Sequence, residues 1–355
     1  MMRRRANPQG IALISIVMLA NAANAAGRSG GLTEVAGLEV GHHTLTERPT
    51  GCTVILARGG AVAGVDVRGG APGTRETDLL DPVNTVQEVH AIVLSGGSSF
   101  GLDTASGVMR YLDEHDIGFE TQAGVVPIVP AAILFDLPVG GRPEIRPGPE
   151  CGYAAAKAAT SGPVAEGNVG AGAGATIGKL GGPNSAMKAG IGTASIRLED
   201  GLVVAALVAV NAVGDVIDPA TGEVVAGARG PDGRTLLDAR TLIRAGGAPT
   251  LPPRAGENTT LGVVATNARL TQVQAKKMAM MAHDGLARAI SPAHLPSDGD
   301  AIFALATGAW EGEADIGILG ALAAEALADA IVRAATQATS IPGYPAARDL
   351  GAPRR

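Results

Sequence analysis

The pattern Gly-x-Ser-x-Gly, which can place a reactive serine on a sharp turn between a strand and a helix, occurs as Gly97-Ser98-Ser99-Phe100-Gly101. An expected strand at 90–94 precedes it, and an expected helix at 99–115 follows. In α/β-hydrolases such a turn exposes the serine oxygen, and an acid and a histidine follow later in the chain. The same residues also suit a helix start, with Ser98 or Ser99 capping free amides. Ser99 is therefore one candidate nucleophile.

A second candidate lies at the Asn258-Thr259 junction, between a Pro/Gly-rich loop at 244–258 and an apolar run. A threonine hydroxyl held against the preceding carbonyl can attack it, move the acyl group to oxygen and leave a new N-terminus after hydrolysis. The freed threonine then carries a nucleophilic oxygen and its own α-amine, one way to activate a hydroxyl. Threonine also begins many strands because it suits β structure, so both interpretations remain open from the junction alone.

Three polar residues could assist a nucleophile. Asp298 and Asp300 flank Gly299 just before an expected strand at 302–307, where they could orient a nucleophile or accept its proton, or form a solvated turn. Asn211 interrupts an otherwise apolar strand. A buried amide needs hydrogen-bond partners, and one use for it is donation to an oxyanion.

Phosphate and metal sites are poorly supported. The Gly-rich run at 167–182 departs from a P-loop, because Ala173 replaces a required glycine and Leu180 stands where Ser or Thr should bind magnesium. We interpret its glycines as structural. The histidines lack metal-ligand spacing, and His283-Asp284 is interpreted as a cap or packing pair inside a helix. We therefore expect neither a cofactor nor a metal.

Composition excludes some classes of partner. Aromatic residues are only 2% of the chain, which argues against a surface for stacking nucleic-acid bases. The net charge of -6 offers no basic stripe for nucleic acid either. The core must be built from Ala, Val, Leu and Ile.

The first 25 residues resemble a signal peptide. Arg3, Arg4 and Arg5 precede an apolar run at 11–20, and Ala23-Asn24-Ala25 supplies a cleavage site. We expect an exported, periplasmic or secreted protein without a membrane segment after signal removal. In an oxidising compartment the two cysteines, at 52 and 151, could pair, although two buried free thiols are at least as compatible with the sequence.

Short apolar runs and periodic segments indicate a layered α+β protein rather than a doubly wound parallel sheet. Asp200-Gly201 is a strong hairpin signal, and the fully apolar strands should lie in sheets covered on both faces. Strands are expected at 53–57, 61–67, 90–94, 195–198, 203–210, 261–266 and 302–307, and helices at 99–115, 271–290 and 316–336.

Considered together, these stretches resemble the P1 or S58 family of exported peptidases, the L-aminopeptidase D-amidase/D-esterase and β-aminopeptidyl peptidase group. The resemblance covers nearly all of the mature chain, and seven blocks in the right order are far more specific than one motif. They are GLTEVAGLEVGHH, TGCTVILARGGAVAGVDVRGGAPGTRETDLLDP, LSGGSSFGLD, GNVGAGAGA, LVAVNAVGD, NTTLGVVATNARLT and DGDAIFALATG.

The resemblance implies self-cleavage of a single catalytic domain, 26–355, into an α chain at 26–258 and a β chain at 259–355. Thr259 would be the nucleophile, where well-known members carry serine, and Asn211 would stabilise the oxyanion. The family's supporting Ser-x-Glu falls on Asp298-Gly299-Asp300, where a carboxylate replaces a hydroxyl. The family's pocket tyrosine has no counterpart here. The implied fold is a four-layer αββα sandwich, shared with ornithine acetyltransferases.

The resemblance predicts a hydrolase that releases N-terminal residues from short peptides, amino-acid amides or esters through an acyl-enzyme on Thr259. The α-amine of Thr259 or the region of Asp300 would handle the protons, and the enzyme would be a homo-oligomer of αβ units. The alternatives are an acyltransferase of the ornithine acetyltransferase type, a Ser99-dependent hydrolase and a secreted binding protein without activity.

Overall fold

The computed structural model describes residues 30–182, 184–246 and 257–350, so the expected signal peptide and most of the loop at 244–258 lie outside the described residues. A nine-stranded sheet runs in the order β10-β11-β14-β16-β2-β4-β7-β3, and β1 pairs with β2 beside this path. Its strands are β1 (Glu39–Thr44), β2 (Gly51–Val67), β3 (Thr74–Arg75), β4 (Glu88–Ser95), β7 (Ala131–Ile133), β10 (Ile191–Arg197), β11 (Val203–Asn211), β14 (Thr259–Thr266) and β16 (Ala301–Ala306).

Smaller elements surround this sheet in the described part of the chain. The short strands are β5 (Phe119–Thr121), β6 (Gly124–Val126), β8 (Thr176–Ile177), β9 (Met187–Lys188), β12 (Asp215–Ile217), β13 (Val224–Ala226) and β15 (Ile290–Ser291). The α-helices are α2 (Thr104–Asp113), α3 (Pro149–Lys157), α4 (Ala239–Arg244), α5 (Gln272–Ala289) and α6 (Ile316–Thr336). The 3₁₀ helices are η2 (Leu32–Glu34), η3 (Asp78–Leu80), η4 (Ser98–Asp103), η5 (Gly170–Gly172), η6 (Lys179–Gly181) and η7 (Ala347–Asp349).

Strand β2 joins the two halves of the sheet. Its first half pairs with β1 and β4, and its second half pairs with β16. The register against β4 shifts between Leu56 and Ala61, and Gly60 in that interval has a φ of 79°. Glycine adopts this left-handed conformation at little cost. The two strands predicted at 53–57 and 61–67 are therefore one strand with an irregularity between them.

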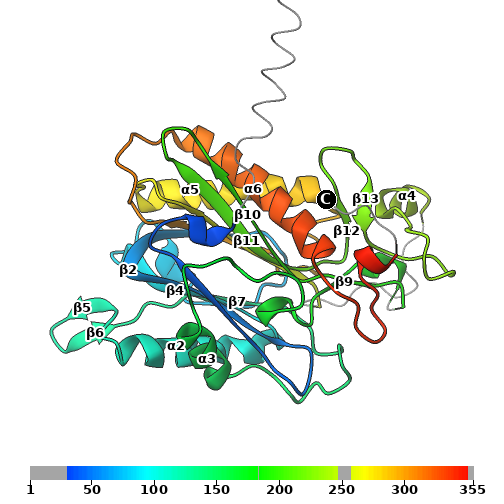
Figure 1. Cartoon of the computed structure of the whole chain (residues 1–355), viewed down its shortest axis with the longest axis horizontal. Coiled ribbons are helices and arrows are strands. Elements are labelled where there is room, and N and C mark those ends of the chain that lie inside the picture. Colours follow the sequence, from blue (N-terminus) through cyan, green and yellow to red (C-terminus); the bar gives the residue numbers. More distant parts are fainter. Residues whose placement is uncertain (1–29, 183, 247–256, 351–355) are drawn as a thin grey trace, which may run out of the picture.

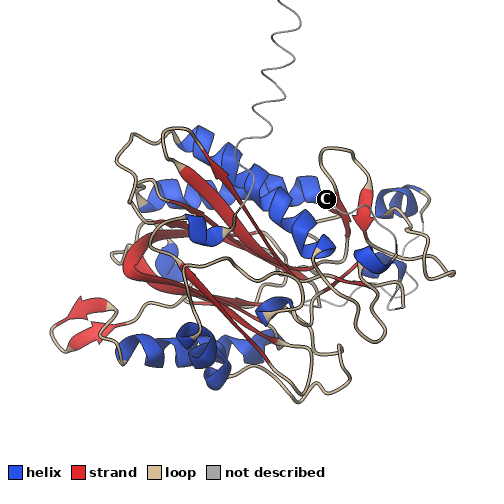
Figure 2. Ribbon diagram, viewed as in Figure 1, coloured by secondary structure: helices blue, strands red, loops and turns tan. Residues whose placement is uncertain are grey.

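Helices pack on the outer faces of the two halves (Figures 1 and 2). Helices α5 and α6 contact each other, α5 lies on β2 and β16, and α6 lies on β10 and β11. Helices α2 and α3 pack together, and α3 contacts β1 and β2. A separate apolar cluster contains inward-facing residues of both halves, such as Ile55, Leu207 and Phe303. The predicted α+β class is confirmed.

The strongest periodic signals locate their elements well. The hairpin of β10 and β11 turns at Asp200-Gly201, and β11, β14 and β16 are buried at every residue. The helix predicted at 99–115 is wrong in its first turns, because η4 occupies them and α2 begins only at Thr104. Neither helix start has a side-chain cap, so the predicted capping by Ser98 or Ser99 is also wrong.

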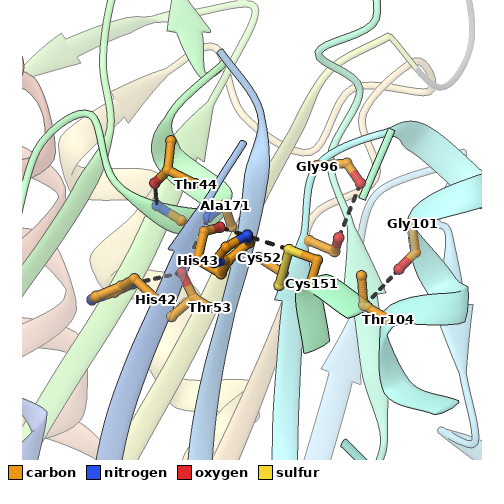
Figure 3. The surroundings of a disulfide bond; sticks show 12 residues. His42, His43, Thr44, Cys52, Thr53, Gly96, Gly101, Thr104, Cys151 and Ala171 are labelled. Carbon is orange, nitrogen blue, oxygen red and sulfur yellow. Dashed lines mark hydrogen bonds between the residues drawn. A yellow bond between two sulfur atoms is a disulfide. The ribbon is translucent and has the colours of Figure 1, made fainter. Parts of the chain in front are cut away.

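A disulfide joins Cys52 of β2 to Cys151 of α3, which selects one of the two states left open by the sequence (Figure 3). Beside it, the Thr53 hydroxyl contacts His42 Nδ1 and accepts a hydrogen bond from the Ala171 backbone. The hydrogen bond from Ala171 connects the Gly-rich run to β2. Among the described helices, none has the length and apolar character needed to cross a membrane.

Candidate active site

Asn211 and Thr259 face each other on neighbouring strands. Strand β11 ends at Asn211, β14 begins at Thr259, and the two residues are direct partners in the antiparallel register. Both are buried, with Asn211 fully covered and Thr259 only 2% exposed. The pairing follows from two long apolar strands whose register is fixed by burial on both faces. The two residues singled out by the sequence are thus brought together.

The Thr259 hydroxyl lies against the peptide group that precedes it. In the intact chain, Thr259 Oγ1 donates to the Asn258 carbonyl oxygen at 2.5 Å, and the Gly299 amide donates to the same oxygen at 2.8 Å. A Cβ on Gly299 would lie 2.7 Å from Thr259 Oγ1, so a glycine is needed to leave room for the hydroxyl. Hydrogen-bond donors on a carbonyl oxygen stabilise the negative charge that develops during attack on its carbon.

The two predicted acids have different surroundings. Asp300 Oδ1 accepts from the Thr260 amide at 2.7 Å, and Asp300 Oδ2 contacts both the amide and Nδ1 of His294 at 3.1 and 2.9 Å. Asp298 Oδ2 accepts from the Leu295 amide at 2.8 Å, whereas its Oδ1 is buried without a partner in the described part of the chain. Asp300 is therefore fully engaged, and Asp298 retains an acceptor oxygen.

Asp298 also has a shifted pKa. It is 3% exposed and forms an isolated parallel bridge with Asn258. Burial, followed by the neighbouring charge of Asp300, raises the pKa of the Asp298 carboxyl to about 6. A carboxyl group that titrates near neutral pH and has a free oxygen is suited to exchanging a proton with a nucleophile.

Lys179 is a site residue that the sequence analysis missed. Its Nζ donates to Asn211 Oδ1 at 2.9 Å and to the Asn211 carbonyl at 3.1 Å. Burial lowers the pKa of the Lys179 ammonium to about 7, and the charge of Asp298 opposes this shift. The available signal was the Gly178-Lys179 pair in the Gly-rich run, where Gly178 has a φ of 70°. That run does not match a phosphate loop, but its lysine, Lys179, lies in the site.

The hydrogen bonds of the Asn211 side chain orient its amide. Oδ1 accepts from the Thr176 amide at 3.0 Å as well as from Lys179, and Nδ2 donates to the Phe135 carbonyl at 2.9 Å. An amide nitrogen has two hydrogens. Among the described residues Phe135 takes one of them, which leaves the second available to an oxyanion.

Ser99 lies in a different setting from Thr259. It is exposed on η4, and no histidine contact to its side chain occurs among the described residues.

His283, interpreted from the sequence as part of a cap or packing pair, is buried with Nε2 3.0 Å from the Asp66 carbonyl oxygen. Its ring also packs edge-on against His294, whose contact with Asp300 the sequence did not reveal.

Comparison with known proteins identifies the family of the chain. The model of peptidase family S58 matches residues 30–348. An uncharacterized aminopeptidase of Mycobacterium bovis is 44% identical over 347 residues, covering 90% of this chain and 97% of the relative. A β-aminopeptidase structure from Burkholderia sp. is 27% identical with a TM-score of 0.61, covering 88% of each chain.

A second solved structure bears on the fold alone. It is the L-aminopeptidase D-Ala-esterase/amidase of Ochrobactrum anthropi, described as a variant of the Ntn hydrolase fold. It is 20% identical, with a TM-score of 0.65 and 89% of each chain covered. The described chain therefore has the fold of this group of hydrolases.

Proposed function

The chain belongs to peptidase family S58 and is an aminopeptidase, and we propose that it works through Thr259 after cutting itself between Asn258 and Thr259. One observation carries this proposal. The Thr259 hydroxyl lies 2.5 Å from the oxygen of the carbonyl that it would attack, and the Gly299 amide already donates to that oxygen.

Self-cleavage begins when Thr259 Oγ1 attacks the carbonyl carbon of Asn258. The new C–O bond replaces the C–N bond, the hydroxyl proton passes through a base to the departing α-amine, and an ester links the two residues. Water then hydrolyses that ester, which frees the hydroxyl and leaves a carboxylate on Asn258. The Gly299 amide stabilises the oxyanion in this step.

Substrate turnover repeats the same chemistry on an external carbonyl. Thr259 Oγ1 attacks the scissile carbonyl, and the free hydrogen of Asn211 Nδ2 is suited to the tetrahedral oxyanion. The leaving amine takes a proton and departs, and water hydrolyses the acyl-enzyme. Because the nucleophile sits at the start of a buried strand opposite Asn211, its position is set by the sheet rather than by a loop.

The proposed proton acceptor is Asp298, with Lys179 beside it. Asp298 has a free buried oxygen and a pKa raised to about 6 by burial, so it is largely ionised at pH 7. Lys179, with its pKa lowered to about 7 by burial, is present in both charge states there. Asp300 instead holds the backbone next to the nucleophile through Thr260.

The proposal also includes the substrate class of the enzyme, its oligomeric assembly and its cellular compartment. Substrates are short peptides, amino-acid amides or esters with a free N-terminus, and αβ units assemble into a homo-oligomer. Three separate apolar clusters, two beneath helices and one between the sheet halves, support the four-layer αββα arrangement. The disulfide supports an oxidising compartment such as the periplasm.

Trapping the acyl-enzyme tests the proposal. The purified protein is mixed with the p-nitrophenyl ester of L-alanine, quenched in acid and analysed by mass spectrometry after digestion. The expected adduct is one alanyl group on the peptide that begins at Thr259. An adduct on the peptide containing Ser99, or none anywhere during turnover, would refute it. Adding a primary amine separates hydrolysis from acyl transfer, since a transferase would convert the ester mainly to the amide.

A further inference from the structure

We propose that His294 is a positioning residue, which holds Asp300 as an oriented carboxylate and thereby fixes the new N-terminus at Thr259. This inference rests on the proposed self-cleavage and adds a residue to it. Three observations on His294 support it: its double contact with Asp300, its backbone conformation and its packing.

The first observation is that His294 contacts one oxygen of Asp300 twice. Its backbone amide lies 3.1 Å and its Nδ1 2.9 Å from Asp300 Oδ2, while Asp300 Oδ1 accepts from the Thr260 amide at 2.7 Å. The side chain of Asp300 is only 4% exposed. The carboxylate therefore links the His294 loop directly to the residue that follows the nucleophile.

The second observation is the backbone of His294, which has a φ of 57°. This left-handed region is unfavourable for a residue with a side chain. In this conformation the backbone amide and the ring of His294 both contact Asp300 Oδ2. The surrounding structure thus maintains a strained residue at the point where it contacts Asp300, and such strain tends to occur at functional sites.

The third observation is the packing of the imidazole. The His283 ring of α5 lies edge-on with its centroid 4.8 Å from that of His294, and His283 Nε2 is 3.0 Å from the Asp66 carbonyl oxygen. Burial lowers the pKa of His283 to about 4, so it is neutral where the enzyme works. The other charged groups around this pair are Asp66 near the end of β2, Arg68 directly after that strand, and Asp298 on the site side.

Cleavage increases the importance of this contact. Before it, Thr259 is held through the peptide bond to Asn258, whose carbonyl is bound by Gly299. After it, the pairing with β11 and the Asp300 contact to Thr260 remain. The two contacts of His294 with Asp300 Oδ2 hold this carboxyl group in the orientation in which Oδ1 accepts from the Thr260 amide.

Two substitutions of nearly the same shape test the role. His294→Asn puts an N–H donor where Nδ1 lies, whereas His294→Gln puts one where Nε2 lies. Self-cleavage is followed on gels after cell-free synthesis, and kcat and KM are measured on L-alanine p-nitroanilide from pH 4.5 to 9. His90→Leu, which removes a buried imidazole on β4, controls for general loss of packing, and thermal melts check folding of each variant.

We expect His294→Gln to slow self-cleavage and to lower kcat by about 10- to 100-fold, the scale of a small misplacement of reacting groups. The loss should appear in kcat rather than in KM, because a misplaced nucleophile slows the reaction without weakening substrate binding. His294→Asn, which keeps a donor to Asp300 Oδ2, should restore most of the rate, and KM should change little in both variants.

Equal impairment of the two variants, or a loss in a folded His294→Gln that appears in KM rather than in kcat, would overturn the role of His294. These results would leave the nucleophile untouched. Cleavage in a Thr259→Ala chain would instead refute the proposed function, so the two failures are distinguishable.

Discussion

Lys179 Nζ donates to Asn211 Oδ1 at 2.9 Å, and this contact fixes on which side of the Asn211 amide the oxygen lies. With the oxygen occupied by Lys179 and Thr176, the nitrogen must lie on the other side, where it donates to Phe135. The lysine therefore sets the orientation of a hydrogen-bond donor that lies opposite Thr259 in the sheet. A side chain from a Gly-rich turn thus anchors the end of β11 at the site.

The oxyanion role that we propose for Asn211 predicts the behaviour of Asn211→Asp. The new carboxylate keeps an acceptor for Lys179 and Thr176 but has no hydrogen to donate, so we expect kcat to fall by about 10²- to 10³-fold with little change in KM. Steady-state kinetics on L-alanine p-nitroanilide measure this. Asn211→Ala should lose as much activity and also some stability, because Lys179 and the Thr176 amide lose the Oδ1 acceptor and Lys179 keeps only the backbone carbonyl of residue 211. An Asn211→Asp enzyme within about tenfold of wild type would argue against an oxyanion donor here.

The raised pKa of Asp298 predicts an acid limb in the activity profile. A base must be ionised to accept a proton, so kcat should rise with pH through about 6, where this carboxyl titrates. In Asp298→Asn the activity should fall by about 10²- to 10⁴-fold and the limb near pH 6 should disappear. Asp113→Asn, an exposed carboxyl at the end of α2, is the matched control. If the acid limb persists unchanged in Asp298→Asn, it arises from the titration of another group.

Ser99→Ala should leave both self-cleavage and turnover nearly unchanged. Ser99 is exposed on η4, and substitutions on the surface away from special features alter stability by less than about 0.5 kcal/mol. Gel analysis of the two chains and a kcat measurement suffice. Loss of turnover in a correctly cleaved Ser99→Ala protein would revive the serine-hydrolase interpretation.

The buried ion pair of Arg48 and Asp136 should be important for stability. Both side chains are fully buried, their charged atoms are 2.9 Å apart, and Asp136 also accepts from Thr50 and the Gly97 amide. Asp136→Ala leaves a buried guanidinium without its counter-charge, which typically costs about 3–5 kcal/mol of unfolding free energy.

Urea unfolding of the purified variants measures this effect. The control is Glu150→Ala, which removes an exposed partner of Arg110 and should cost less than about 1 kcal/mol. Because Asp136 follows Phe135, the acceptor of Asn211, Asp136→Ala should also lower kcat. Similar stability losses in the two variants would mean that the buried pair has no special role.

Much of the fold could be predicted because its strands are apolar on both faces. The run at 203–210 has no polar residue and the run at 261–266 has only Thr266 at its end, so their burial and approximate ends follow from the sequence alone, as does the turn at Asp200-Gly201. The same contrast between polar and apolar positions made Asn211 and the Asn258-Thr259 junction conspicuous.

Other parts of the site depend on contacts between distant segments, which local patterns do not reveal. Nothing in the spacing of Lys179 from Asn211 indicates that one side chain binds the other. The link between His294 and Asp300 needs a backbone conformation that is rare for histidine. The pairing of Cys52 with Cys151 likewise depends on how α3 docks against β2.

Self-cleavage before Thr259 is measured most directly by the mass of the purified protein, together with N-terminal sequencing of its fragments. We predict two fragments in the wild type, the smaller one beginning Thr-Thr-Leu-Gly, and a single inactive chain in Thr259→Ala. Thr259→Ser, which keeps a hydroxyl, should still be cut. An active wild-type enzyme that remains one chain, or a Thr259→Ala protein that appears as two chains, would show that Thr259 does not cut the chain.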